Sequence, residues 1–577
     1  MNLSWELMVK DHLRPLAALL IAAVVLWAPL MRGPIDIRWD AGVYYILGTS
    51  LARGEGYRIL SEPGNPQAVQ YPPLLPLLVA AHERVLGTSD PVVVGKWLRV
   101  TFQLMLMGSV VVTYVFARRL LSPWQAFAVG VIYLLSRWTY FLGSLCFADL
   151  PFMLVGLLFF LPRRSGWKSE VTKGFCAIAA YLLRTIGIAL LVTWVAQSLI
   201  QRQWKRAALR TAVALVPLLL WQGYVNFVKA SDAYQHPVYA YQRAPYQFYN
   251  VPYGDNLAYL NPYRPELGRA TSAEMVERVA RNLIPIVRTF GEAVSSITSY
   301  HEPNSSRRRY QTVLAAVLYG FSAAIIVGLA VLARRGEWPM IIYLALSILL
   351  IAATPWPEQF SRYFSPLVPF MAIGLVQGIA WAKQQIGGRR DNLALQWLTS
   401  VGPAAIVFAA VAAEFVIAVR SYGGPDDLAT YVDARGIEHP YRLFFYGKEW
   451  RDFETSLDWL QHHAQPGAVV GTSCPYIVYL KLNLKAVMPP RETDVDKAQR
   501  FLDSVPVTYL IVDDLRFLPD DSNNYIRPVV QTHADRWKKV YGVPATATAI
   551  YQRVGAPPAT AAMIRPSRFK DINMTPS

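Results

Sequence analysis

The chain has 577 residues, of which 54% are hydrophobic and 16% are charged, with 56 Lys and Arg against 39 Asp and Glu. Soluble proteins usually carry about 25% charged residues, so this composition argues against a purely soluble enzyme and excludes a disordered or collagen-like chain. Several stretches reach the roughly 18–20 apolar residues that cross a bilayer core. The sequence therefore predicts a multi-pass membrane protein.

About eleven apolar segments are predicted to cross the membrane as helices. They are residues 14–31, 97–117, 122–142, 147–161, 172–183, 184–200, 207–227, 311–332, 339–355, 363–381 and 400–420. Alternating crossings place every basic loop cluster on one side, which is predicted to be the cytoplasm because Lys and Arg gather in cytoplasmic loops. The net charge of +17 then reflects topology, and no nucleic-acid partner is expected. The count requires a hairpin over 172–200, with Arg184 near its outer tip.

The same count divides the chain into a membrane domain, 1–420, and an outer soluble α/β domain, 421–577. The membrane domain carries two large outer loops, 32–96 and 228–310. In the tail, short apolar runs predict strands at 468–473, 485–490 and 507–514, helices at 476–482 and 493–504, and a terminal hairpin. Thr493 and Asp496 are predicted to start the second helix. Residues after about 555 are predicted to be disordered.

Charged residues at the outer ends of the spans are the candidates for chemistry. Asp40 follows the first span, and on spacing alone the favoured explanation is a helix cap or a partner of Arg38. Asp149 begins an apolar span, where an ionisable side chain is a functional candidate. The alternatives are a snorkelling residue at the membrane interface and a structural partner of Arg184. Arg184 and Arg362 carry guanidinium groups suited to phosphate, or they serve as interfacial anchors. Together the four residues predict a site for a lipid phosphate and an acid–base step.

The outer loop 228–310 is rich in tyrosine. Tyr234, Tyr239, Tyr241, Tyr246, Tyr249, Tyr253, Tyr259 and Tyr263 fall within about thirty residues of one another. Aromatic faces of this kind suit sugar or acceptor binding in a functional lid. An amphipathic belt on the membrane surface explains them equally well. Cys146, Cys176 and Cys474 are too few for a disulfide framework or a cysteine metal site, and they are interpreted as packing residues.

Several motifs, in order, resemble the GT-C membrane glycosyltransferases, in particular the protein O-mannosyltransferases and lipid A aminoarabinose transferases. They are the acid of 38-RWDAGVYY-45, 51-LARGEGY-57, 71-YPPLLP-76, 148-ADLPF-152, 182-LLRTIG-187 and 362-RYFSPLVP-369. The resemblance covers residues 1–420 in outline. It implies a polyprenyl-phosphate-linked sugar as the donor and an acceptor reached from the outer face.

The resemblance also implies roles for individual residues. Asp40 would be the general base, and Asp149 would help to hold the acceptor. Arg362 and Tyr363 would approach the donor phosphate, with Arg184 as a weaker match. Tyr44, Tyr45 and Tyr71 are predicted to contact substrate. Two departures leave the sugar and the acceptor open: Tyr71 stands where the aminoarabinose transferases have lysine, and Asp40 is followed by Ala41 where the mannosyltransferases have a second acid.

The sequence thus predicts an inverting glycosyltransferase of the cell (inner) membrane, with its site and its tail on the extracytoplasmic side. Its partners would be the lipid-linked donor, membrane lipids and a protein, lipid or glycan acceptor. No cofactor and no metal site are required, although Asp40 and Asp149 could share a divalent cation. A lipid-linked sugar transporter or flippase is the first alternative, and it predicts charges near the bilayer midplane. An O-antigen ligase is the second, and it predicts basic residues in one large outer loop.

Overall fold

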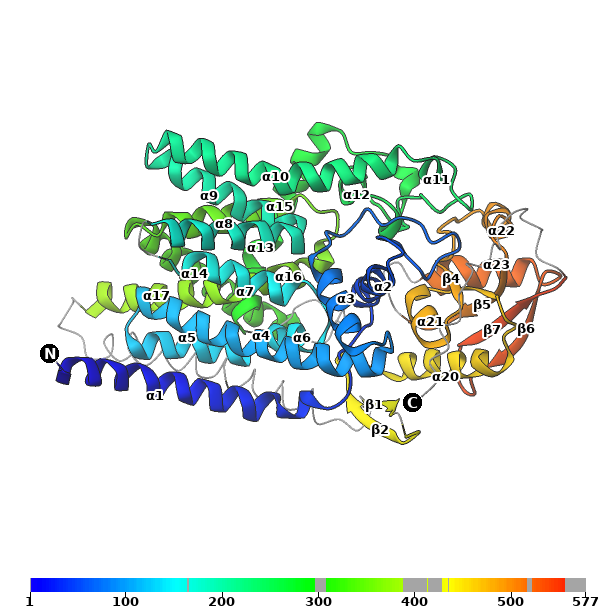
Figure 1. Ribbon diagram of the computed structural model, residues 1–577, viewed down its shortest axis with the longest axis horizontal. Helices are drawn as coiled ribbons and strands as arrows, with labels where there is room; N and C mark the ends of the chain where they lie inside the picture. Colours follow the sequence, from blue (N-terminus) through cyan, green and yellow to red (C-terminus); the bar gives the residue numbers. More distant parts are fainter. Residues whose placement is uncertain are drawn as a thin grey trace, which may run out of the picture. The chain divides into compact units, whose positions relative to one another are not determined.

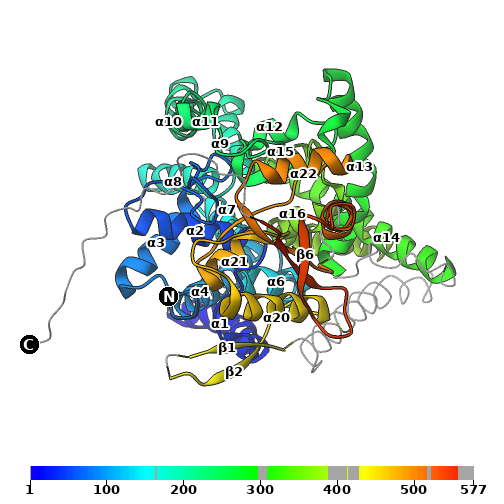
Figure 2. The same ribbon diagram turned by 90° about the vertical axis from the view of Figure 1, so that its right-hand side faces the viewer.

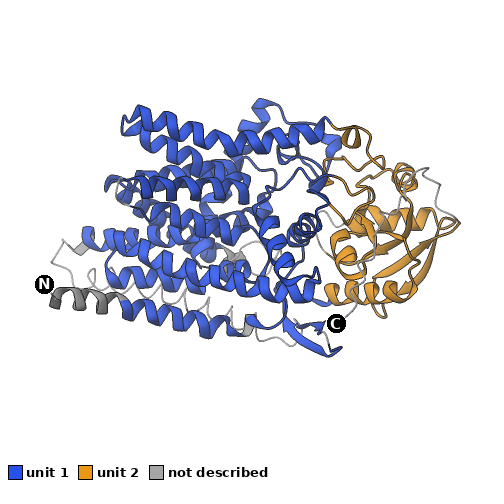
Figure 3. Cartoon of the chain, in the orientation of Figure 1, with its two compact units in different colours: residues 1–58, 67–230, 248–448 blue, residues 59–66, 231–247, 449–577 orange. Residues whose placement is uncertain are grey.

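The structure is a computed structural model that describes residues 2–162, 166–295, 308–387, 412, 428–433, 435–515 and 521–555. The chain forms two compact units, and both draw on segments that are distant in sequence (Figure 3). Unit 1 comprises residues 1–58, 67–230 and 248–448, and unit 2 comprises 59–66, 231–247 and 449–577. These units divide the chain at positions other than residue 420, so the outer domain over 421–577 stays a prediction.

Unit 1 is built almost entirely of helices, the longer of which run side by side (Figure 1). They are α1 (Asn2–Trp27), α2 (Asp40–Ala52), α3 (Leu74–Leu86), α4 (Pro91–Leu120), α5 (Pro123–Leu135), α6 (Arg137–Ser144), α7 (Asp149–Phe160), α8 (Trp167–Leu183), α9 (Ile188–Ile200), α10 (Trp204–Lys229), α12 (Tyr253–Leu257), α13 (Ser272–Ser295), α14 (Arg308–Arg334), α15 (Trp338–Ala352), α16 (Phe360–Phe364) and α17 (Val368–Gly387). Unit 1 also holds an antiparallel hairpin of β1 (Leu428–Val432) and β2 (Glu438–Arg442), which the sequence did not predict.

Four stretches of the described residues are helical, long and apolar enough to cross a membrane: Pro91–Leu120, Trp204–Lys229, Thr312–Arg334 and Pro357–Gln385. A fifth, predicted as one span over 122–142, consists of α5 and α6, which meet at 57°. The bend falls at Ser136, whose extended backbone ends α5 and precedes α6. Shorter apolar helices cover the expected spans at 14–31, 147–161, 184–200 and 339–355. The span at 400–420 lies almost wholly outside the described residues, so the total of eleven stays a prediction.

The predicted break between 172–183 and 184–200 is present. Helix α8 ends at Leu183, Arg184 is extended, and α9 begins at Ile188 after a single 3-10 turn, Thr185–Gly187. The turn packs directly on α8, because a Cβ on Gly187 would lie 2.3 Å from the carbonyl carbon of Ala180. Only glycine allows this close approach of the two backbones, which places Arg184 at the point where the chain reverses.

Unit 2 contains a five-stranded mixed sheet in the order β4-β3-β5-β7-β6, of which the edge strand β6 is labelled in Figure 2. Strand β3 (Val469–Gly471) runs parallel to β4 (Lys485–Val487) and β5 (Val507–Val512), whereas β7 (Ala549–Arg553) is antiparallel to β5 and to β6 (Trp537–Gly542). The helices are α11 (Asp232–Gln235), α20 (Lys448–His463), α21 (Pro475–Leu482), α22 (Val495–Asp503) and α23 (Arg527–Thr532). The strands, the hairpin, α21 and α22 confirm the sequence predictions for this region. The cap of α22 differs: it is Asp494, whose carboxylate accepts a hydrogen bond from the Lys497 amide at 3.0 Å.

Tyrosines from the loop 228–310 belong to the core of unit 2. Tyr239, Tyr241 and Tyr246 are each no more than 3% exposed and cluster with aliphatic residues of the sheet and of α22. The Tyr239 hydroxyl donates to Glu62 at 2.9 Å, and the Tyr241 hydroxyl donates to the Met488 carbonyl at 3.2 Å. These three residues therefore act as packing residues, a role that neither the lid nor the membrane-belt interpretation had predicted.

A buried carboxyl group in unit 2 makes stability dependent on pH. Burial raises the pKa of Asp513 to about 7, against hydrogen bonds from Ser473 and from the Leu515 amide. Because the folded pKa lies above the unfolded value, this contribution to stability is complete below pH 4 and is lost as the pH rises to about 7. We expect the free energy of unfolding to fall by up to about 1.4 kcal/mol per pH unit in that window. The unfolding temperature of the full chain should fall between pH 5 and pH 7.5, and it should fall less for Asp513→Asn than for the wild type. An equal fall in both proteins would show that Asp513 is not the source of the pH dependence.

Candidate active site

Two acids begin the helices α2 and α7, and a short stretch of backbone pairing joins the segments that precede these helices. Asp36 forms an isolated parallel bridge with Leu145, with the Asp36 amide 3.0 Å from the Ser144 carbonyl and the Cys146 amide 3.0 Å from the Asp36 carbonyl. Asp40 and Asp149 each follow four residues after the paired position, at the first residue of α2 and of α7. Helix N-termini carry partial positive charge, which favours carboxylates there. This pairing explains why acids 109 positions apart in sequence share one site.

An arginine lies between the two carboxylates. Arg362 Nη2 is 2.7 Å from Asp40 Oδ2 and 3.8 Å from Asp149 Oδ2. Asp149 is also paired with Arg184, whose guanidinium donates to its other carboxylate oxygen. The Asp149 side chain is 2% exposed, whereas that of Asp40 keeps 19%. The site therefore holds two positive and two negative charges, and Asp40 is the acid that a second molecule can reach.

Tyrosine side chains surround Asp40 on its other side. The Tyr249 hydroxyl donates to Asp40 Oδ1 at 3.1 Å. The Tyr71 ring lies between the rings of Tyr44 and Tyr249, with centroids 4.6 Å and 6.0 Å away. Burial by itself would raise the pKa of Asp40, but the charge of Arg362 and hydrogen bonds from Arg362, Tyr249 and Tyr71 together hold this pKa below its ordinary value of 3.8. Asp40 is therefore ionised at neutral pH.

Asp40, Tyr44, Tyr71, Arg184 and Arg362 line one cavity of about 240 Å³ within unit 1. The rest of its lining includes Tyr253, Tyr363 and the aliphatic side chains of Leu183, Ile186, Leu257, Leu350 and Ile351. A phosphate bound in this cavity would thus meet both charged and aliphatic side chains. Pockets of this kind, with few convergent polar groups and an apolar lining, are the usual form of a small-molecule site.

Helix α13 fixes the segment that carries Arg362. The Asn282 side-chain amide donates to the carbonyls of Ala352 and Thr354, at 2.8 Å and 3.0 Å, where α15 ends. Further along, the Ser361 hydroxyl donates to Glu292 at 3.2 Å. Arg362 itself sits on the five-residue helix α16, and its guanidinium carbon lies 4.2 Å from the centre of the Phe147 ring. Sequence reasoning had not identified Asn282, Glu292 or Phe147, because amides and aromatics in such segments carry no distinctive pattern.

The structure brings together most of the residues that the sequence predicted, with one exception. Asp40, Asp149, Arg184, Arg362, Tyr363, Tyr44 and Tyr71 are all within this group. Tyr45 is not: it is fully buried, and its hydroxyl donates to the Ser89 carbonyl at 3.1 Å. Adjacent helical residues point about 100° apart, and on α2 this turns Tyr45 toward Ser89 while Tyr44 lines the cavity. Tyr249 and Tyr253, two members of the tyrosine-rich loop, are at the site in its place.

The interpretations of Asp40 as a helix cap and as a partner of Arg38 are both wrong. Asp40 caps no helix, because the N-cap of α2 is Trp39 and no side chain caps it. Arg38 is instead paired with Asp36, at 2.7 Å, and donates to the carbonyls of Phe444 and Phe445. Trp39 has a positive φ of 56°, a strained conformation for a bulky residue. Such strain persists only where the surroundings hold it, and it is common at functional sites.

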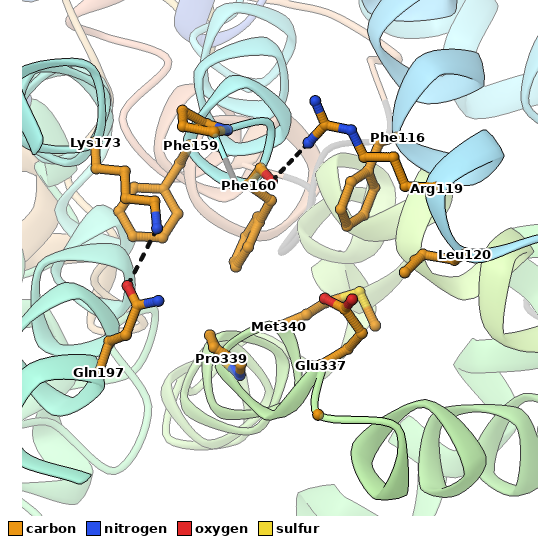
Figure 4. A pocket seen from close by; sticks show the side chains of 12 residues that line it. Phe116, Arg119, Leu120, Phe159, Phe160, Lys173, Gln197, Glu337, Pro339 and Met340 are labelled. Carbon is orange, nitrogen blue, oxygen red and sulfur yellow. Dashed lines mark hydrogen bonds between the residues drawn. The ribbon is translucent and has the colours of Figure 1, made fainter. Parts of the chain in front are cut away.

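A second cavity of unit 1 lies at the opposite ends of the same helices. It measures about 160 Å³ and is lined by Arg119, Lys173, Glu337 and the rings of Phe116, Phe159 and Phe160 (Figure 4). Helix α7 runs from Asp149 to Phe160, which separates this cavity from the acids by about 16 Å at 1.5 Å per residue. Within it, Lys173 donates to Gln197 at 3.3 Å and Arg119 to the Phe160 carbonyl at 3.3 Å. The two basic side chains therefore serve local contacts at a distance from the candidate site.

Among the described residues, no group of three or more His, Cys, Asp and Glu side chains is placed to hold a metal ion. The two site acids are the only candidates that the sequence suggested. A divalent cation shared by Asp40 and Asp149 would have to take the place between them that Arg362 occupies.

No protein-family model and no curated protein matches the sequence, but solved structures match its fold. The oligosaccharyltransferase of Archaeoglobus fulgidus, solved with a tethered acceptor peptide, aligns with 94% of this chain and 74% of its own, at a TM-score of 0.51 and 12% identity. The arabinofuranosyltransferase AftD from Mycobacteria aligns with 95% of this chain and 40% of its own, at a TM-score of 0.43 and 16% identity. ArnT from Cupriavidus metallidurans, bound to undecaprenyl phosphate, aligns with 98% of this chain and 100% of its own, at a TM-score of 0.39 and 13% identity. The match to the oligosaccharyltransferase, the one of these three with a TM-score above 0.5, shows that this chain shares that protein's fold.

The hydrogen bond from Tyr249 to Asp40 can be tested by removing one oxygen. Tyr249→Phe keeps the ring beside Tyr71 but removes a donor to a carboxylate, so we expect a reaction that uses Asp40 as its base to slow about 10-fold. The pKa of Asp40 should rise, because this hydrogen bond lowers it, and the acidic limb of the pH–rate profile should move to higher pH. Tyr241→Phe, which removes a hydroxyl bonded to Met488, is the control and should leave the profile unchanged. Equal profiles for both variants would show that Tyr249 does not act on Asp40.

Proposed function

We propose that this chain is an integral membrane glycosyltransferase that moves a sugar from a polyprenyl-phosphate donor to an acceptor hydroxyl, with inversion, at the extracytoplasmic face of the cell (inner) membrane. The observation that supports this most is the position of Arg362, 2.7 Å from a partly exposed carboxylate, in a cavity lined by both charged and aliphatic side chains. A phosphate-binding cation, a base and a surface for a lipid chain are thus combined in one place.

The reaction that this arrangement supports is a single displacement. The acceptor oxygen forms a bond to the anomeric carbon of the sugar, and the bond from that carbon to the phosphate oxygen breaks, leaving its electron pair on the phosphate. The hydroxyl proton passes to Asp40, which is ionised and exposed on the cavity side. A carboxylate within hydrogen-bond reach contributes about 10²–10⁴-fold as a general base. Attack from the side opposite the phosphate inverts the anomeric centre.

Arg362 and Arg184 would stabilise the leaving phosphate. A phosphate needs positive charge and no proton as it departs, and guanidinium groups supply two parallel donors in fixed geometry. Their effect is large in a cavity shielded from water, where charges interact more strongly. Asp149, almost completely buried and paired with Arg184, would orient that arginine and help to hold the acceptor.

The transporter alternative fits the structure less well. Transporters place ionisable groups in broken helices near the middle of the membrane. Here the acids are the first residues of α2 and α7, and Arg184 lies between the ends of α8 and α9. The O-antigen ligase alternative has no specific contact in its favour.

The test is transfer from a panel of radiolabelled polyprenyl-phosphate sugars, using the purified chain in vesicles with candidate protein, lipid and glycan acceptors. With at least one donor, we expect the sugar label to appear in a product that forms only when the protein is present. Vesicles with the donor in only one leaflet report the face: label should transfer from the leaflet on the side of the loops 32–96 and 228–310. Movement of intact donor between leaflets without transfer would replace this proposal with the transporter.

A further inference from the structure

The charges of the candidate site are balanced before any substrate is present, and this has a consequence for the order of events. Arg184 neutralises Asp149, and Arg362 neutralises Asp40 while lying within 3.8 Å of Asp149. An anionic donor entering this site adds a negative charge, so one of the existing pairs must give up its cation. Resting on the proposed function, we propose that Arg362 exchanges partners: it covers Asp40 in the empty site and moves to the donor phosphate in the loaded site. The base is then free only after the donor has bound.

The geometry determines which acid loses its partner. Asp149 is bonded to Arg184 and would keep that cation when Arg362 leaves. Asp40 has Arg362 as its only cationic partner among the residues that the structure describes, and its remaining partners are the neutral hydroxyls of Tyr249 and Tyr71. These hydroxyls hold the carboxylate in position without neutralising it. The departure of Arg362 therefore produces one unpaired and oriented carboxylate, at Asp40.

Arg362 can make this exchange by rotation of its side chain. The side chain is 18% exposed and lines the same cavity as Asp40, so a phosphate in that cavity is within its reach. Its guanidinium carbon lies over the Phe147 ring, 4.2 Å from the ring centre, well inside the roughly 6 Å range of a cation–π contact. The backbone of its helix is fixed by the Ser361 and Asn282 contacts and does not need to move.

The exchange imposes a compulsory order of binding. In the empty site an acceptor hydroxyl would meet a carboxylate already engaged by Arg362, which accepts a proton poorly because its pKa is held low. Once Arg362 has moved to the phosphate, Asp40 becomes more basic, since burial alone raises its pKa. After transfer, the protonated Asp40 is neutral and does not attract Arg362. Loss of that proton restores the ion pair, which competes with the spent polyprenyl phosphate and favours its release.

This mechanism predicts an affinity change in the opposite direction to the change in activity. If Asp40 competes with the phosphate for Arg362, then Asp40→Asn and Asp40→Ala should bind undecaprenyl phosphate about 5-fold more tightly than the wild type, the effect of one ion pair of about 1 kcal/mol. Both should be inactive in transfer. Asp40→Glu keeps the charge and should bind like the wild type. Lys173→Gln removes a cation about 16 Å away, by the length of α7, and should not change binding.

The experiment measures binding of undecaprenyl phosphate to the full-length chain in detergent, with size-exclusion profiles to confirm that each variant is folded. Tighter binding by both neutral variants supports the exchange. Equal or weaker binding by a folded Asp40→Ala variant overturns it, because Asp40 would then not compete for Arg362. A wild-type chain that binds no polyprenyl phosphate would instead remove the proposed function itself. Failure of the exchange would appear as an unchanged or lower affinity in Asp40→Ala, whereas failure of the proposed function would appear as no binding by the wild type.

Discussion

The Asp40→Asn variant should transfer sugar at least about 100-fold more slowly than the wild-type chain, while it remains folded and still binds the donor. The substitution keeps the shape of the side chain but removes the group that takes the acceptor proton, and a lost general base costs about 10²–10⁴-fold. The Tyr249 hydroxyl can still donate to the amide oxygen, so the side chain should stay in place. Initial rates at saturating donor measure the effect.

Asp255→Asn is the matched control for that comparison. Asp255 belongs to the loop 228–310, which also carries Tyr249. It is 35% exposed and is paired with Lys229 at 3.0 Å, but it does not line the cavity. Its substitution should change the rate by less than about 2-fold, since partly exposed ion pairs contribute about 0–1 kcal/mol. If Asp40→Asn and Asp255→Asn had similar rates, Asp40 would be a structural residue and the assignment of the base would fail.

Loss of Arg362 should have an effect of similar size through a different step. Arg362→Gln removes the cation that stabilises the departing phosphate, and removal of one such stabilising group typically costs about 10²–10³-fold in kcat. Donor affinity should fall as well, because the guanidinium also binds the phosphate in the ground state. Arg362→Lys should recover part of the rate, since it restores the charge without the paired donors. Steady-state kinetics with varied donor separates the two effects.

Arg264→Gln serves as the control for the removal of positive charge. Arg264 pairs with Glu266 at 3.0 Å, and both side chains are more than half exposed. Its substitution should leave kcat and the donor KM unchanged. An Arg362→Gln variant with normal kcat would contradict the role of Arg362 at the leaving group, even if the donor KM rose.

The charged residues of the site could be predicted from the sequence because they violate the pattern around them. Asp149 stands at the edge of an apolar run and Arg184 between two such runs, and a membrane tolerates such residues only for a reason. The charges of the short loops also predicted that all four residues lie on the same side of the membrane. What could not be predicted was the pairing of Asp36 with Leu145, because backbone hydrogen bonds between distant segments leave no trace in residue type.

The tyrosines of the loop 228–310 could be recognised as a group from the sequence, but their individual roles could not be predicted. The composition of the loop 228–310 singled out its tyrosines as a group, but their roles depend on where each ring packs. Tyr239, Tyr241 and Tyr246 fill the core of unit 2, while Tyr249, only a few residues later, donates to Asp40. Tyr45 was predicted at the site with its neighbour Tyr44, yet the helix turns it away. The same residue type on one short segment serves packing in one place and the candidate site in the next.

Strand and helix positions in unit 2 followed from short apolar runs and amphipathic spacing, which report local burial. The sequence did not predict that residues 59–66 and 231–247 belong to unit 2, because these segments have the composition of ordinary loops. Their contacts depend on single bonds, such as that between the Ala486 amide and the Ser61 carbonyl at 2.8 Å. The hairpin of β1 and β2 was missed for a related reason: its burial pattern is mostly intermediate and gives little alternation.

The most direct test of the central claim is a single-turnover assay with the purified chain in vesicles, using a polyprenyl-phosphate donor labelled in the sugar and separately in the lipid phosphate. We expect the sugar label to move to the acceptor with inverted anomeric configuration and the phosphate label to stay on the lipid. Asp40→Asn should lower the rate at least about 100-fold. Transfer at equal rates by the wild type and Asp40→Asn, or retention of configuration, would contradict the central claim.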